Sequence, residues 1–150
     1  MSRKAPLTMM ELMVMILVFA LAAALCLQAF VKSDQMSRRV EARDTAAVLC
    51  QSVAELIQHE KGDLALALEK VSGTEAAQRP GFGYFANYDS DWKVIEGVGT
   101  GAYTLRVIEI DSDIQGLGKA QVEAYQWSKG EMESLFSLEV SWQKEVTAHG

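Results

Sequence analysis

The side chains that could support chemistry are few and stand far apart in the sequence. The only histidines are His59 and His149, and neither has a nucleophile or a second metal ligand at a useful spacing, so we interpret both as surface residues. Cys26 falls in an apolar run and Cys50 on an apolar stripe, where cysteines act as small packing residues. Because no catalytic set can be assembled, we predict that the protein is not an enzyme and has no cofactor.

Two aspartate pairs and one glycine-rich segment could in principle bind a ligand. The pairs Asp89/Asp91 and Asp111/Asp113 each place two carboxylates two positions apart in expected loops. A hard cation takes about six to eight oxygen ligands, so we interpret these aspartates as turn-forming residues and predict no metal site. The segment 97–101 has glycine at alternate positions but no helix signal after it, which favours a flexible turn over a phosphate-binding loop.

One carboxylate stands at the mouth of a long apolar run. No polar side chain occurs from Leu12 to Leu27, and Gln28 is the only interruption before Val31. At ~1.5 Å per residue this run makes a helix of about 30 Å, the thickness of a bilayer's hydrocarbon core. A carboxylate inside such a layer costs up to ~2.5–3.5 kcal/mol. We therefore expect Glu11 to have a partner.

The segment 6–31, PLTMMELMVMILVFALAAALCLQAFV, resembles the amino-terminal segment of type IV pilins and of the pilin-like proteins of type II secretion and competence systems. The resemblance implies that residues 1–6 are a prepilin leader, cut between Pro6 and Leu7 by a prepilin peptidase. Leu7 would then carry the methylated amino end, and Thr8 and Glu11 would be assembly residues. The family usually has Gly before the cut and Phe or Met after it, so Pro6 and Leu7 are departures.

The same resemblance implies a function and a location. The chain would be a structural subunit of a type IV pilus (a fimbrium) or of a secretion or competence pseudopilus, assembled through its amino-terminal helix. Glu11 would pair with the amino group of Leu7 in an adjacent subunit. The implied partners are other pilin-like subunits in a homo- or hetero-oligomeric fibre, the prepilin peptidase, and membrane lipid before assembly. The chain would cross the cell membrane once, with its leader in the cytoplasm and its carboxyl-terminal domain outside or in an extracellular fibre.

Charge alone gives a weak orientation. Arg3 and Lys4 favour a cytoplasmic amino terminus, whereas Lys32 and the arginines between 38 and 43 favour the opposite. Two other interpretations of the apolar run stay open. It could be an ordinary signal peptide, cut near residues 22–24, or a simple anchor for an extracellular binding module that presents loops such as 88–91 or 111–118.

The outer part of the chain is acidic. Residues 45–150 hold sixteen Asp and Glu against eight Lys and Arg, which argues against a nucleic-acid partner because phosphate backbones need a concentrated positive surface. On one continuous helix Cys26 and Cys50 are about 36 Å apart at ~1.5 Å per residue. A disulfide needs Cα atoms within about 7 Å, so none is expected.

A single helix is predicted from Leu7 to Lys61, since no Pro or Gly occurs between them and Gly62 supplies a stop. Its length is about 80 Å at ~1.5 Å per residue. Residues 7–31 would be the transmembrane and assembly part, and residues 32–62 an amphipathic continuation. The apolar stripe of this continuation comprises Met36, Val40, Ala47, Cys50, Ala54 and Ile57, broadened by Val53 and Leu56.

Residues 63–150 are predicted to form a globular antiparallel sheet domain. Asp63 can cap a short helix to about Val71, and residues 72–81 are expected to be a loop. Alternation and turn signals then indicate strands at 82–87, 92–95, 103–107 and 119–127, with a last strand that includes Phe136 to Gln143 in a hairpin spanning Lys119–Val146. The expected fold is α+β, pilin-like, with the long helix packed on a sheet of four to five antiparallel strands, each covering the other's apolar face.

Overall fold

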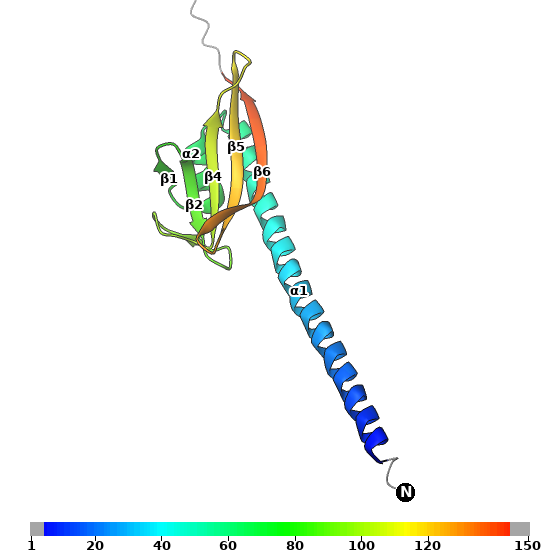
Figure 1. Ribbon diagram of the computed structural model, residues 1–150. Coiled ribbons are helices and arrows are strands. Elements are labelled where there is room, and N and C mark those ends of the chain that lie inside the picture. The colour runs from blue at the N-terminus through cyan, green and yellow to red at the C-terminus, as the bar shows by residue number, and fades with distance from the viewer. Residues whose placement is uncertain (1–4, 145–150) are drawn as a thin grey trace, which may run out of the picture. The chain divides into compact units, whose positions relative to one another are not determined.

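The computed structural model describes residues 5–144, which form two helices and six strands. The elements in chain order are α1 (Ala5–His59), α2 (Leu64–Ser72), β1 (Ala77–Arg79), β2 (Gly83–Tyr88), β3 (Val94–Ile95), β4 (Tyr103–Ile110), β5 (Leu117–Ser128) and β6 (Glu131–Gln143) (Figure 1). The predicted α+β class, a long helix and an antiparallel sheet, is confirmed. By internal contacts the chain divides into two units, with the boundary between Glu41 and Ala42 inside α1.

Some predictions concern residues outside the described range. These are the cytoplasmic placement of Arg3 and Lys4, the hairpin end at Val146, and the surface position of His149.

The helix α1 is uninterrupted, as the absence of Pro and Gly between Leu7 and Lys61 predicts. It ends at His59, two residues before the predicted end. Lys61 adopts a left-handed φ of 53°, and the N–H of Gly62 bonds to the carbonyl of Ile57 at 2.9 Å. This is a Schellman-type ending with a lysine in the left-handed position, so the helix stops before the glycine that predicted its end.

The buried face of α1 begins later than predicted. Met36 and Val40, the first residues of the predicted stripe, are exposed, because no other element among residues 5–144 covers them. Ala47 is only half-buried, and its neighbour Ala46 is fully buried instead. The buried positions recur every three or four residues, as one helix face requires: Ala42, Ala46, Cys50, Val53 and Ile57.

All strand pairs are antiparallel, in the order β1-β2-β4-β5-β6, with β3 also paired to β2. The sheet has one strand more than the four or five predicted. The additional strand is β1, which lies in the segment predicted to be a loop. It is only three residues long and turns into β2 at Pro80–Gly81, so it is too short to show an alternating pattern.

One face of the sheet carries the core. The register places Ala86 opposite Leu105 and Leu105 opposite Ala124, and all three side chains are buried. The part of α1 from Ala42 to Ile57 and the helix α2 lie against this face (Figure 1), and their buried apolar residues belong to the same cluster. The prediction that helix and sheet cover each other therefore holds for the part of α1 from Ala42 to Ile57.

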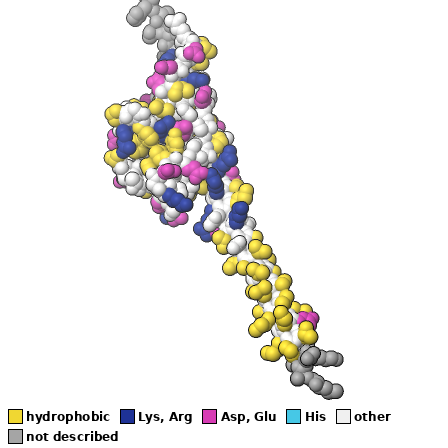
Figure 2. Space-filling model, in the orientation of Figure 1, with side chains coloured by type: hydrophobic (Ala, Val, Ile, Leu, Met, Phe, Trp, Pro, Cys, Tyr) yellow, Lys and Arg dark blue, Asp and Glu magenta, His cyan; other side chains and the backbone are white. Residues whose placement is uncertain are grey.

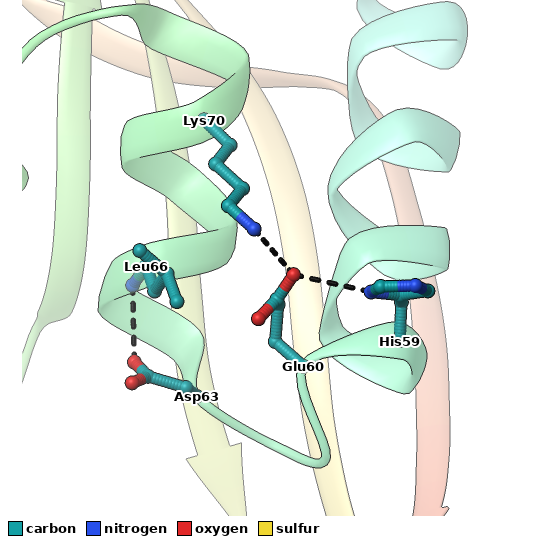
Figure 3. A network of polar contacts seen from close by, with 5 residues as sticks. All are labelled: His59, Glu60, Asp63, Leu66 and Lys70. Carbon is teal, nitrogen blue, oxygen red and sulfur yellow. Dashed lines mark hydrogen bonds and ion pairs between the residues drawn. The ribbon is translucent and has the colours of Figure 1, made fainter.

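Polar contacts fix the junction between α1 and α2 (Figure 3). Glu60 accepts a hydrogen bond from the Lys70 ammonium, and its Oε1 lies 3.1 Å from Nδ1 of His59. The hydrogen bond from Lys70, followed by that from His59, holds the pKa of the Glu60 carboxyl below its usual range. Asp63 caps α2 as predicted, because its side chain accepts the N–H of Leu66 at 3.0 Å. His59 is exposed, as predicted.

Trp142 fills a space that two glycines leave open. A β-carbon on Gly62 would lie 2.0 Å from Nε1 of the indole, and a β-carbon on Gly118 would lie 2.2 Å from its Cε2. Gly118 on β5 is the register partner of Trp142 on β6. The segment after α1 and the last two strands therefore meet at one buried indole.

We expect Gly118→Ala to lower the free energy of unfolding of the sheet domain by about 1–3 kcal/mol, because the indole or β5 must shift to admit the methyl group. Gly99→Ala is a matched control: neither glycine has a positive φ, and a β-carbon at Gly99 would lie 3.7 Å from its nearest neighbour, Cγ2 of Ile95. The control should change stability by less than about 0.5 kcal/mol. Urea denaturation followed by tryptophan fluorescence measures both, and equal effects would contradict this account of Trp142.

Two neutral side chains of the core could ionise only at a cost. Burial, with a smaller contribution from the charge of Glu123, raises the pKa of the free Cys50 thiol from 9.0 to about 12. Burial likewise raises the pKa of Tyr88 to about 12, and its hydroxyl has no hydrogen-bond partner within residues 5–144. Both groups stay protonated in the folded chain at pH values where the unfolded chain has begun to release them.

These two protonated groups should contribute their full stabilisation below the pKa of the thiol in the unfolded chain. The stabilisation should be lost as the pH rises towards the pKa values that Cys50 and Tyr88 have in the folded chain. We expect the free energy of unfolding to fall from about pH 9 upward, by up to about 1.4 kcal/mol per pH unit for each group. Cys50→Ala should flatten the slope between pH 9 and 10, whatever its effect at pH 7. Denaturant titrations at pH values across this range measure the slope. An unchanged slope in the Cys50→Ala chain would refute the assignment of the pH dependence to the Cys50 thiol.

Candidate functional site

The most extensive exposed apolar surface belongs to the first half of α1, residues 6–31. Large apolar side chains stand exposed along its whole length, with Leu7 at 69%, Phe19 at 77% and Phe30 at 78%. Figure 2 shows apolar side chains over the visible face of this part of the helix. Among residues 5–144, α1 is the one helix that is long and apolar enough to cross a membrane.

Such a surface needs cover. Monomeric soluble proteins rarely expose contiguous apolar patches larger than a few hundred Å², and each large apolar side chain gains about 1.5–3 kcal/mol when it leaves water. The backbone of residues 6–31 is helical throughout, so its C=O groups and, beyond the first turn, its N–H groups bond within α1. This is the condition for a backbone to lie in hydrocarbon or against other apolar helices.

Glu11 is the only charged side chain between Leu7 and Val31. It is exposed and has no hydrogen bond or ion pair within residues 5–144. Leu7 and Thr8 precede it by four and three residues, so all three lie on one face at the start of the helix. An amino group at Leu7 would stand one turn away, about 6 Å along the axis at ~1.5 Å per residue, and the positive end of the helix dipole also favours a carboxylate there.

Pro6 and Leu7 lie in the first turn of α1. Proline is tolerated at this place because the first N–H groups of a helix have no acceptor within it. The bond between the two residues is therefore at the least supported end of the helix, where opening the backbone breaks few hydrogen bonds. Cleavage of this bond and methylation of Leu7 stay predictions.

The other residues considered for chemistry are dispersed. Asp89 is a turn-former, as predicted, since its Oδ1 accepts the N–H groups of Asp91 and Lys93 at 2.9 Å each. Cys50 is buried and Cys26 is exposed on the apolar part of α1. Within the described part of the chain, no three His, Cys, Asp or Glu side chains are grouped so that they could hold a metal ion.

One feature had no counterpart among the predictions. A cavity of about 130 Å³ opens on the sheet face that the helices leave uncovered, lined by Arg79, Phe82, Phe85, Asn87, Val98, Gly99, Thr100, Thr104, Trp127 and Met132. These residues come from five strands, the turn between β1 and β2, and the loop before β4, so no local motif marks them. The only sequence signal is apolar or aromatic residues at outward positions of predicted strands.

Comparison of the chain with family models, with curated proteins and with solved structures finds no match in any of the three.

Proposed function

We propose that the protein is a pilin-like structural subunit that assembles into a fibre through residues 7–31 after removal of residues 1–6. The observation that supports this most directly is the exposed apolar helix, whose carboxylate near the start, Glu11, has no partner within residues 5–144. The composition of segment 6–31 supports the same proposal through its resemblance to pilin and pseudopilin amino termini. In the membrane the helix crosses the bilayer once, with the leader in the cytoplasm and the sheet domain outside.

In this proposal lipid and neighbouring subunits cover the same surface in turn. The apolar side chains of residues 7–31 lie in the bilayer before assembly and pack against the equivalent helices of other subunits afterwards. Lipid tails are as apolar as these side chains, so van der Waals packing and polar contacts must drive association. Glu11 supplies the polar contact, since its carboxylate pairs with the amino group of Leu7 in an adjacent subunit.

The pairing also sets the axial position of one subunit against the next. A carboxylate left without a partner in an apolar bundle costs several kcal/mol, whereas shifts of one apolar helix along another change the packing energy much less. The arrangement that satisfies Glu11 is therefore selected over the others. The sheet domain, which packs on the part of α1 from Ala42 to Ile57, then lies outside the bundle of apolar helices.

The mature amino terminus is the first test. Intact-mass and peptide-mass measurement of the protein purified from its native membrane should give a chain that begins at Leu7, with one added methyl group on its amino nitrogen. Pro6→Gly, which restores the usual family residue, should raise the cleaved fraction if the wild-type chain is cut incompletely. A chain cut near residues 22–24 would make this an ordinary exported protein, and an intact Met1 would leave a membrane-anchored binding module.

Replacement of Glu11 tests the assembly mechanism. Glu11→Ala should leave the protein in the membrane fraction but reduce its incorporation into fibres by at least about tenfold, the factor that ~1.4 kcal/mol per contact represents. Glu11→Gln should have a similar effect, because it keeps the shape and removes the charge. Glu55→Ala is the control, since Glu55 is an exposed glutamate of the same helix outside the apolar segment. Sheared fibre fractions and electron microscopy measure incorporation, and normal fibres from the Glu11 variants would refute the mechanism.

A further inference from the structure

The cavity on the uncovered face of the sheet has a polar floor whose hydrogen bonds fix its shape. Thr104 donates its hydroxyl to Oδ1 of Asn87 at 2.8 Å, and the indole N–H of Trp127 donates to the Thr104 hydroxyl at 3.2 Å. Asn87 also donates its amide to the carbonyl of Gly99 at 2.5 Å, which ties the 97–101 loop to the sheet. Asn87 and Thr104 are 5% and 3% exposed, so the floor is rigid and preformed.

Apolar side chains form much of the wall. Residues 42–144 expose only four large hydrophobic side chains, and two of them, Val98 and Trp127, line this one cavity. Phe82 and Met132 are half-buried beside them. Exposed apolar groups gathered around a polar floor are typical of ligand pockets rather than of ordinary surface.

Two arginines and three aromatic rings form an alternating series that includes three cavity residues, Arg79, Phe82 and Phe85. The Arg79 guanidinium lies 5.5 Å from the Phe85 ring and 6.0 Å from the Phe82 ring. The Arg106 guanidinium lies 4.9 Å from the centre of the Phe82 ring and 5.4 Å from the centre of the Tyr125 ring. The rings restrict both guanidiniums, which lowers the entropy lost when either binds a further group.

The two arginines differ in their charge partners. Arg106 is neutralised by Glu123, whose carboxylate lies 2.5 Å from its terminal nitrogen. Arg79 is exposed, lines the cavity, and has no ion pair within residues 5–144. Residues 45–150 hold sixteen acidic and eight basic residues, yet the Arg79 guanidinium forms no ion pair with any acidic residue of the described part of the chain.

We propose that this cavity binds a small organic carboxylate, with Arg79 pairing with the carboxylate and the apolar wall holding a short hydrocarbon stem. The planar fork of a guanidinium matches a carboxylate with two parallel hydrogen bonds. The volume of about 130 Å³ corresponds to about four water molecules, which suits a stem of a few carbons. A wholly polar anion such as phosphate would leave Val98, Trp127 and Met132 without an apolar neighbour. The proposal does not depend on the function proposed for α1.

The indole N–H signals of the full-length chain in detergent micelles provide the test, after labelling of the three tryptophans with ¹⁵N. Butyrate, added at constant ionic strength, should shift the Trp127 signal to saturation with a Kd of ~1–10 mM, as expected for so few ligand atoms. The Trp142 signal should not move, because that indole lies between Gly62 and Gly118. Trp127→Phe identifies the Trp127 signal.

Variants and neutral or polar ligands decide the result. Arg79→Gln should weaken butyrate binding at least tenfold, Arg79→Lys should weaken it less, and Lys129→Gln, at another exposed basic residue of the sheet domain, should leave it unchanged. Butyramide and inorganic phosphate should each bind at least tenfold more weakly than butyrate. An unshifted Trp142 signal in each variant shows that the fold is kept.

The proposal is overturned if butyrate gives no saturable shift up to about 100 mM, if Arg79→Gln binds as the wild type does, or if butyramide or phosphate binds as well as butyrate. The source of the carboxylate can be read from one more ligand. This ligand is a glutamate residue blocked at both ends. If it binds more tightly than butyrate, the natural ligand is the carboxylate of a protein side chain; if it binds more weakly, the natural ligand is a free acid.

Discussion

Most of this structure depends on the continuity of the backbone hydrogen bonds in α1. Every turn of a helix satisfies its own N–H and C=O groups, so one helix can pass from an apolar environment into water without a break in the chain. Only the side chains need to change along the way. From Leu12 to Val31 they are apolar on all sides except at Gln28, and from Ala42 onward one face is buried against the sheet. The first part of α1 is thus apolar enough to cross a membrane, whereas residues 42–57 form part of the core of the sheet domain.

The parts of the fold that could be predicted are those specified by neighbours in the sequence. The strands β4, β5 and β6 show their alternation locally, and the turn between β5 and β6 has Lys129 and Gly130 in left-handed conformations, as a two-residue hairpin turn needs. The cap of α2 by Asp63 depends on contacts three residues away. Such features need no knowledge of what lies on the other side of the molecule.

The features that escaped prediction depend on distant partners. The apolar periodicity of α1 continues through Met36 and Val40, so the sequence alone does not show that burial starts at Ala42. Strand β1 exists because β2 is beside it. The candidate sites show the same contrast between local and long-range features. Residues 6–31 could be recognised because their composition is a local property, whereas the cavity at Arg79 is assembled from residues up to 53 positions apart.

The packing of α1 on the sheet also has a mechanical consequence. Tension applied along the helix axis acts parallel to the interface, so it loads the buried side chains from Ala42 to Ile57 together, in shear, instead of peeling them apart one by one. Beyond them, the indole of Trp142 fills the space beside both Gly62 and Gly118. A close-packed interface of this kind deforms little before it fails as a whole. Residues 42–57 of α1 are therefore built into the core of the sheet domain and form one packed unit with it.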